Sequence, residues 1–166
     1  MLVLGVDPGT AITGYGLVRE NTAGDVHLVT YGVIRTAAVE PLPQRLQMIY
    51  QELQALLRRY HPDVAAVEEL FFNRNARTAL AVGQARGVVL LALVNAGLPI
   101  HEYTPLQVKQ ALVGYGRATK AQVQEMTRLV LSLDQTPRPD DAADAVAVAV
   151  CHIHSARLTA LLSTTG

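Results

Sequence analysis

A short apolar run near the N-terminus, residues 2–6, ends in Asp7, and the chain then turns at Pro8 and Gly9. The length and branched composition of the run are typical of a buried strand, and Asp7 is its first charge. An unpaired buried carboxylate is costly, so an acid at this position needs a cation or a metal ion as partner. The alternative is a turn aspartate that caps backbone N–H groups. The choice depends on whether other carboxylates reach the same place.

The periodicity of the remaining chain predicts an α/β domain. Alternating residues and short turns favour an antiparallel meander of three strands, and the three- and four-residue steps that follow favour helices. We expect strands at 2–6, 13–19, 27–35, 64–67 and 98–103, and helices at 43–60, 75–95, 105–113, 120–131 and 140–161. No repeat or linker divides the chain, so residues 1–166 are predicted to form a single domain.

The composition of the chain restricts the classes of function that it can have. The 50% hydrophobic content supports a real core. The sequence contains neither a basic leader nor an uninterrupted apolar run of about 18 residues, and it has one cysteine, Cys151, so we expect a cytoplasmic protein without a membrane span. The net charge is zero, but between Arg74 and Arg128 seven basic residues face two acidic ones. Such asymmetry favours a polyanion-binding face, although scattered surface charge also produces it.

Two further acidic groups repeat the pattern of Asp7. Glu68 follows the apolar stretch 64–67, and because strand side chains alternate, only one of Glu68 and Glu69 can join Asp7. At the start of the last helix, Asp141 and Asp144 are three residues apart and share a face. The alanines around them allow that helix to lie close to the sheet. Solvent exposure of Glu68 and capping by the helix-start acids are the structural alternatives.

Carboxylates from two strand ends and one helix make an oxygen-only site, which suits Mg²⁺ or Mn²⁺. His152 and His154 are two apart on a helix and face different directions, so nothing indicates zinc. Two ions about 3.5–4 Å apart would activate a water and stabilise the leaving oxygen of a phosphodiester. The pattern therefore favours a two-metal phosphodiesterase.

Over almost its whole length, the chain resembles a known family, the RuvC-type Holliday junction resolvases. The resemblance is carried by motifs in a specific order: Gly5-Val6-Asp7-Pro8-Gly9 with Thr13-Gly14-Tyr15-Gly16, Ala66-Val67-Glu68-Glu69-Leu70-Phe71, Gly83-Gln84-Ala85-Arg86-Gly87, Gln107-Val108-Lys109-Gln110 and Asp141-Ala142-Ala143-Asp144-Ala145. Some family members have His where this chain has Asp141.

The resemblance implies a ribonuclease-H-like mixed sheet of three antiparallel and two parallel strands, with helices on both faces. It also implies a metal-dependent endodeoxyribonuclease that makes paired nicks in four-way DNA junctions, as a homodimer and with the RuvA–RuvB branch-migration complex. Motif position selects Glu68 over Glu69. The residues implied as metal ligands are Asp7, Glu68, Asp141 and Asp144; those implied near the scissile phosphate are Lys109 and Lys120; and Phe71 matches the aromatic that stacks on a base.

Arg74 and Arg77 follow Phe71, and aromatic beside basic residues is a stacking-plus-phosphate arrangement; with Arg117 they complete the expected DNA-binding set. The helix at 75–95 is apolar nearly all round, with Ala79, Gly83 and Gly87 in a small-residue line. Its second face is covered either by a two-fold mate or by the chain's own neighbouring elements.

Three other functions compete with junction resolution. The first is a ribonuclease-H-like nuclease on structured RNA. The second is an actin- or sugar-kinase-type ATP-binding fold, favoured by Asp7-Pro8-Gly9-Thr10 but lacking a second such loop. The third is a junction-binding protein without catalysis, which the complete acid set disfavours.

Overall fold

In the computed structural model, which describes residues 1–69 and 76–164, five strands form one mixed sheet in the order β3-β2-β1-β4-β5. The strands are β1 (Leu2–Asp7), β2 (Ile12–Glu20), β3 (Val26–Arg35), β4 (Val64–Glu68) and β5 (Ile100–Tyr103). β1, β2 and β3 pair antiparallel, whereas β4 and β5 run parallel to β1. The central strand is therefore β1, the strand that ends in Asp7.

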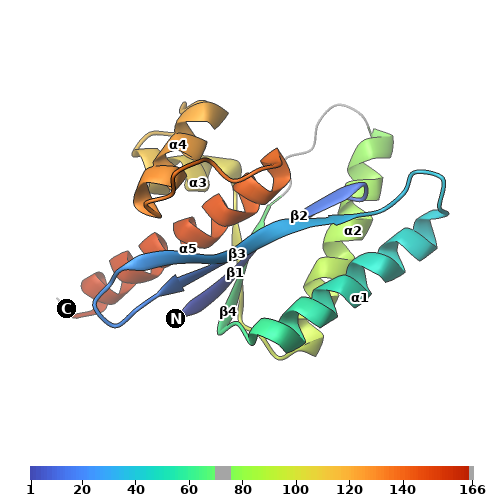
Figure 1. The fold of residues 1–166 in the computed structure, drawn as a ribbon, viewed down its shortest axis with the longest axis horizontal. Coiled ribbons are helices and arrows are strands. Elements are labelled where there is room, and N and C mark those ends of the chain that lie inside the picture. Colours follow the sequence, from blue (N-terminus) through green and yellow to red (C-terminus); the bar gives the residue numbers. More distant parts are fainter. Residues whose placement is uncertain (70–75, 165–166) are drawn as a thin grey trace.

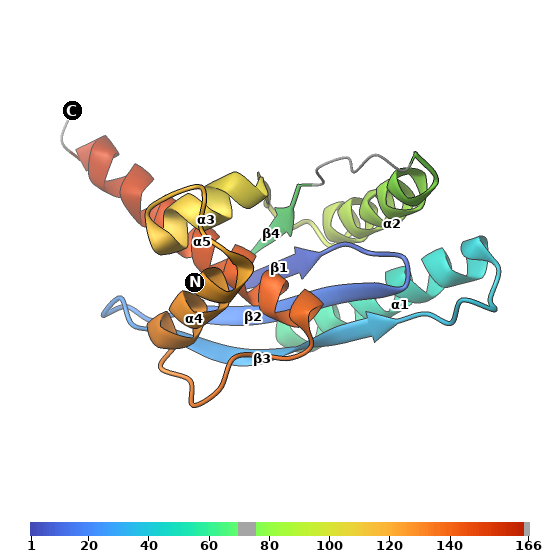
Figure 2. The same ribbon diagram turned by 90° about the horizontal axis from the view of Figure 1, so that it is seen from above.

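Helices cover both faces of this sheet (Figure 1). Two of them, α1 (Leu42–Tyr60) and α2 (Ala76–Asn95), pack against one another on one face. On the other face α5 (Asp140–Thr164) crosses β1 and β2, and α3 (Pro105–Val113) and α4 (Lys120–Val130) pack on α5 (Figure 2). Each face has its own core of buried side chains.

The closest contact in the fold lies between α5 and the two central strands. A Cβ atom added to Gly5 of β1 would collide with the backbone carbonyl of Ala145, and one added to Gly14 of β2 would collide with the carbonyl of Asp141. The helix presents a run of buried small residues to the strands. Backbone thus lies directly on backbone, which places the first turn of α5 against the end of β1.

The expected architecture is confirmed, with small shifts of the element ends. The fifth strand begins at Ile100 instead of residue 98, and the last helix extends to Thr164. Cys151 is fully buried on α5, as expected of a small core residue. On α2, Leu80, Leu91 and Val94 are more than half exposed along one face, so no described element of the same chain covers this face.

One described helix is long and apolar enough to meet the length and composition criterion for a membrane span: α5, over Asp140–Ser163, with half of its most apolar window buried. In this fold α5 packs along β1 and β2. A core helix of this kind meets the same criterion.

Candidate active site

The first two carboxylates come from neighbouring parallel strands. Val6 of β1 pairs with Val67 of β4, so Asp7 and Glu68 follow side by side at the carboxyl ends of these strands. Both are partly buried, whereas Glu69 is exposed and its backbone N–H donates to the carbonyl of Tyr103. The alternation expected from the sequence thus brings Glu68, and not Glu69, to Asp7.

The other two carboxylates come from the first turns of α5. Asp7 pairs in register with Gly14, and Gly14 lies beneath the backbone of Asp141. Asp144 follows three residues later on the same helix face, with 27% of its side chain exposed. The small residues of the sheet and of α5 therefore bring the helix acids to the strand-end acids.

Burial and mutual repulsion disturb the titration of this cluster. Burial, followed by the charges of Glu68, Asp144 and Asp141, raises the pKa of Asp7 to about 8. Burial and the charge of Asp144 also raise the pKa of Glu68, and burial raises that of Asp144 despite its contact with Lys120. Without a metal ion, the cluster takes up a proton, which relieves the repulsion between the carboxylates. Asp7 carries this proton and donates it to Glu68 in a hydrogen bond.

Lys120 is the cation of the described cluster. Its Nζ lies 2.7 Å from Oδ2 of Asp144 and 3.5 Å from Oδ2 of Asp140. The hydrogen bond to Asp144 and the charges of both acids raise the pKa of Lys120, although its partial burial opposes the shift. Asp140, expected only to cap the helix, also accepts from Arg138 and Gln124 and belongs to this ion-pair network. The sequence gives no signal for that role, because Lys120 lies on another helix.

A cavity of about 160 Å³ opens beside the acids, between α3, α4, α5 and the end of β4. Its lining includes Glu68, Asp144, Lys109 and Lys120, and its remaining walls are apolar. The two predicted lysines therefore reach the same cavity as two of the predicted ligands. Arg117 is exposed on the connector between α3 and α4.

Three predicted DNA-binding residues are not placed by the structure. Phe71 and Arg74 lie outside the described residues. Arg77 belongs to α2, but its side chain is also outside the described part. The stacking and phosphate-binding roles expected for these residues stay predictions.

The chemistry of the donor set fits a hard divalent cation, since the converging groups are all carboxylates and repel one another without one. Among the described residues, no three acids, histidines or cysteines lie close enough to surround a single ion as they stand. Asp144 pairs with Lys120, and Asp7 with Glu68. Metal binding by three of these acids therefore requires side-chain rotation.

Comparisons of sequence and fold place this chain among known proteins. Residues 3–152 match the family model described as crossover junction endodeoxyribonuclease RuvC. The chain is 60% identical over 162 residues to the crossover junction endodeoxyribonuclease RuvC of Syntrophomonas wolfei, covering 98% of this chain and 94% of that protein.

Two solved structures show the same fold over nearly the full length. The Thermus thermophilus RuvC structure is 41% identical with a TM-score of 0.88, covering 96% of this chain and 97% of that one. T. thermophilus RuvC in complex with Holliday junction substrate is 39% identical with a TM-score of 0.87, covering 95% of this chain and 96% of that one. The match of sequence and fold shows that this chain belongs to the crossover junction endodeoxyribonuclease RuvC family.

Proposed function

We propose that this chain resolves four-way DNA junctions by metal-dependent hydrolysis of two phosphodiesters, with Asp7, Glu68, Asp141 and Asp144 as metal ligands. Membership of the RuvC family gives the reaction class. The observation that supports the ligand set is the convergence of carboxylates around Asp7, whose pKa is raised to about 8 by burial and by the other acids. Such a cluster is unfavourable for the protein alone, and a divalent cation relieves its repulsion.

Mg²⁺ or Mn²⁺, in a two-ion arrangement, would activate the attacking water and stabilise the leaving oxygen. The protein supplies the carboxylate cradle and two cations at the rim of the cavity. Lys120 is held beside Asp144 and Asp140, where it can pass to a phosphate oxygen. Lys109 lines the same cavity and forms no ion pair with a described residue. We assign Lys109 and Lys120 to the scissile phosphate, and Phe71, Arg74, Arg77 and Arg117 to the flanking DNA.

The proposed assembly is a homodimer through α2. Its outer face presents Leu80, Leu91 and Val94, each more than half exposed. Cβ atoms added to Gly83 and Gly87 would meet no atom within 4 Å. An apolar stripe with glycines at a four-residue spacing fits a second copy of the same helix, and it disfavours cover by the chain's own elements. Two active sites related by a two-fold axis match the symmetry of a four-way junction.

Two further parts of the proposal rest on the family resemblance. The branch-migration partner is the RuvA–RuvB complex, which would deliver the junction to the dimer. The location is the cytoplasm, where bacterial DNA is processed.

The function is tested with a synthetic four-way junction in Mg²⁺ or Mn²⁺. We expect paired symmetric nicks, and we expect Asp7→Asn to abolish cleavage while it retains junction binding. A duplex of the same sequence serves as the control substrate. Cleavage of single strands or of structured RNA without preference for the junction would contradict the proposed substrate, and junction binding without cleavage in either metal would leave only a binding protein.

The dimer is tested with Leu91→Glu, which places a charge on the exposed stripe of α2. Sedimentation at micromolar concentration should show a dimer for the wild type and a monomer for Leu91→Glu. The matched control is Gln51→Glu, an exposed position on α1. If the wild type sediments as a monomer, the assignment of the α2 face to a second copy is wrong.

A further inference from the structure

Four arginines in the part of the chain that the structure describes pair with an acid. Arg86 pairs with Glu102, Arg128 with Glu125, Arg138 with Asp140 and Arg157 with Glu20. Two arginines near the carboxylate end of the sheet differ.

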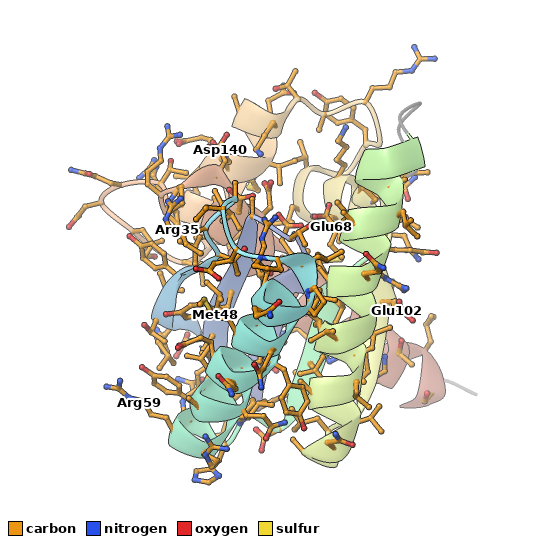
Figure 3. All side chains as sticks on the ribbon, turned by 90° about the vertical axis from the view of Figure 1, so that its right-hand side faces the viewer. Arg35, Met48, Arg59, Glu68, Glu102 and Asp140 are labelled. Atoms are coloured by element: carbon orange, nitrogen blue, oxygen red, sulfur yellow. The ribbon has the colours of Figure 1, made fainter. Side chains whose placement is uncertain are left out.

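Arg35 and Arg45 form no ion pair with any acid in the described ranges 1–69 and 76–164. Arg35 ends β3 and is exposed, and Arg45 lies in the first turn of α1 and is partly exposed. Figure 3 shows Arg35 at the same end of the molecule as Glu68 and Asp140.

A chain of hydrogen bonds connects Arg45 to the loop that follows Asp7. The Thr36 backbone N–H donates to the carbonyl of Ala11 over 3.0 Å. The Thr36 hydroxyl donates to the carbonyl of Thr10 over 2.5 Å and accepts from Nε–H of Arg45 over 2.8 Å. One edge of the Arg45 guanidinium is therefore fixed by the β1–β2 loop. Ordering a long side chain before binding lowers the entropy cost of a later contact.

The strand order places these arginines on one side of the active site. β3 and the start of α1 lie on the β2 side of Asp7, whereas Lys109 lines the cavity beside Glu68, the last residue of β4. The four acids between them repel a polyanion, and Lys120 and Arg138 are already paired with acids. A DNA strand that crosses the acids therefore needs cations on both sides, and on the β2 side Arg35 and Arg45 meet that need.

We propose that Arg35 and Arg45 form a second phosphate-binding surface, on the β3–α1 side of the active site, which contacts the DNA backbone on the opposite side of the scissile phosphate from Lys109. The inference rests on the proposed function, because the ligand is the same junction DNA. The contact is to phosphate oxygens and carries no base specificity.

The test compares Arg35→Gln and Arg45→Gln with a charge-matched control, Arg59→Gln. Arg59 lies at the far end of α1 from Arg45, away from Glu68 and Asp140 (Figure 3). Binding of a labelled four-way junction is measured by fluorescence anisotropy across a salt series, with EDTA present so that no strand is cut. We expect each site variant to bind about three- to tenfold more weakly than Arg59→Gln. The slope of log affinity against log salt should fall by about one.

Arg45→Lys separates phosphate binding from a purely structural role. Lysine keeps the charge but cannot reproduce the Nε–H bond to Thr36, so we expect partial recovery of the salt slope. A purely structural arginine would lower the melting temperature in both Arg45 variants and leave the slope unchanged, which would overturn the proposal for Arg45. Equal affinity and slope for Arg35→Gln, Arg45→Gln and Arg59→Gln would overturn it for both.

Failure of the proposed function gives a different result. In that case the wild-type chain binds the junction no better than a duplex of equal length. The arginine variants are still compared with one another on the same labelled junction. Failure of the proposed function and failure of the arginine proposal can therefore be distinguished.

Discussion

The two halves of α5 each bring polar side chains to the same sheet, with opposite consequences. The first half brings Asp141 and Asp144 to Asp7 and Glu68, where burial and like charge raise the pKa of Asp7 to about 8. The second half brings His152, buried at 5% exposure, to Tyr103 of β5. The Tyr103 hydroxyl lies 2.8 Å from Nδ1 of His152, and the ring of His101 lies 4.6 Å from that of His152.

The difference between these halves is whether the protein itself supplies the partner. His152 is neutral and paired internally, because burial and the neighbouring His101 lower the pKa of His152 to about 4. The carboxylate cluster has one lysine for several acids among the described residues. A buried polar group that is satisfied stabilises a fold, whereas one that needs an external cation marks a site of function.

The largest effect is expected at Asp7. Its raised pKa means that the metal-free folded state binds a proton more tightly than the unfolded state does, so stability falls as pH rises from about 4 to about 8. Asp7→Asn removes the charge and should raise the free energy of unfolding at pH 8 by about 2 to 5 kcal/mol, with little change at pH 4. Urea denaturation in EDTA at both pH values measures this.

The control is Glu52→Gln on the exposed surface of α1. Added Mg²⁺ should stabilise the wild type and leave Asp7→Asn much less affected. Equal stabilisation of the two proteins by Mg²⁺ would show that Asp7 is not a ligand of the metal ion.

A smaller effect with the opposite pH direction is expected at His152. Its lowered pKa means that the unfolded state binds the proton more tightly, so stability falls as pH drops from about 6.5 to about 4. The contribution is on the order of 3 kcal/mol. His152→Gln should flatten this acid limb of the stability curve, measured by urea denaturation between pH 4 and pH 7. The matched control is His27→Gln, at an exposed position on β3. An unchanged acid limb in His152→Gln would show that other groups dominate it.

The smallest effect is expected from Tyr103→Phe. Removal of the hydroxyl leaves Nδ1 of His152 without its 2.8 Å partner and should cost about 1 kcal/mol of unfolding free energy. Junction cleavage should be unchanged at temperatures where the variant is folded, because the Tyr103 hydroxyl contacts His152 and its removal leaves the backbone pairing of Tyr103 with Glu68 intact. A fall in cleavage rate without a fall in stability would show that the contact between Tyr103 and His152 contributes to function, and the two halves of α5 would no longer differ in role.

Sequence periodicity was sufficient to predict the three antiparallel strands and the approximate ends of nearly all elements, whereas the parallel pairing of the last two strands came from the family resemblance. Local signals exist for these features: the alternation in β2 and β3, the leucine spacing of α1, and the turn after Asp7. The pairing of Asp7 with Glu68 was expected from motif position in the family resemblance, and the parallel pairing of β1 with β4 gives its structural reason.

The tertiary contacts of the cations could not be predicted in the same way. Lys120 and Asp140 are twenty positions apart, and their meeting depends on how α4 packs on α5. The link from Arg45 through Thr36 to the β1–β2 loop depends on where α1 begins above the sheet. Such contacts arise from packing, which local sequence patterns do not encode.

The glycine contacts beneath α5 have a consequence for how the active site responds to disturbance. Because a Cβ atom at Gly5 or Gly14 would collide with the backbone of α5, the backbones of helix and strand lie in direct contact. Thermal motion can widen that spacing but cannot reduce it, so displacement of the helix acids is one-sided. The approach of Asp141 and Asp144 to the end of β1 therefore has a lower limit that is the same each time α5 docks.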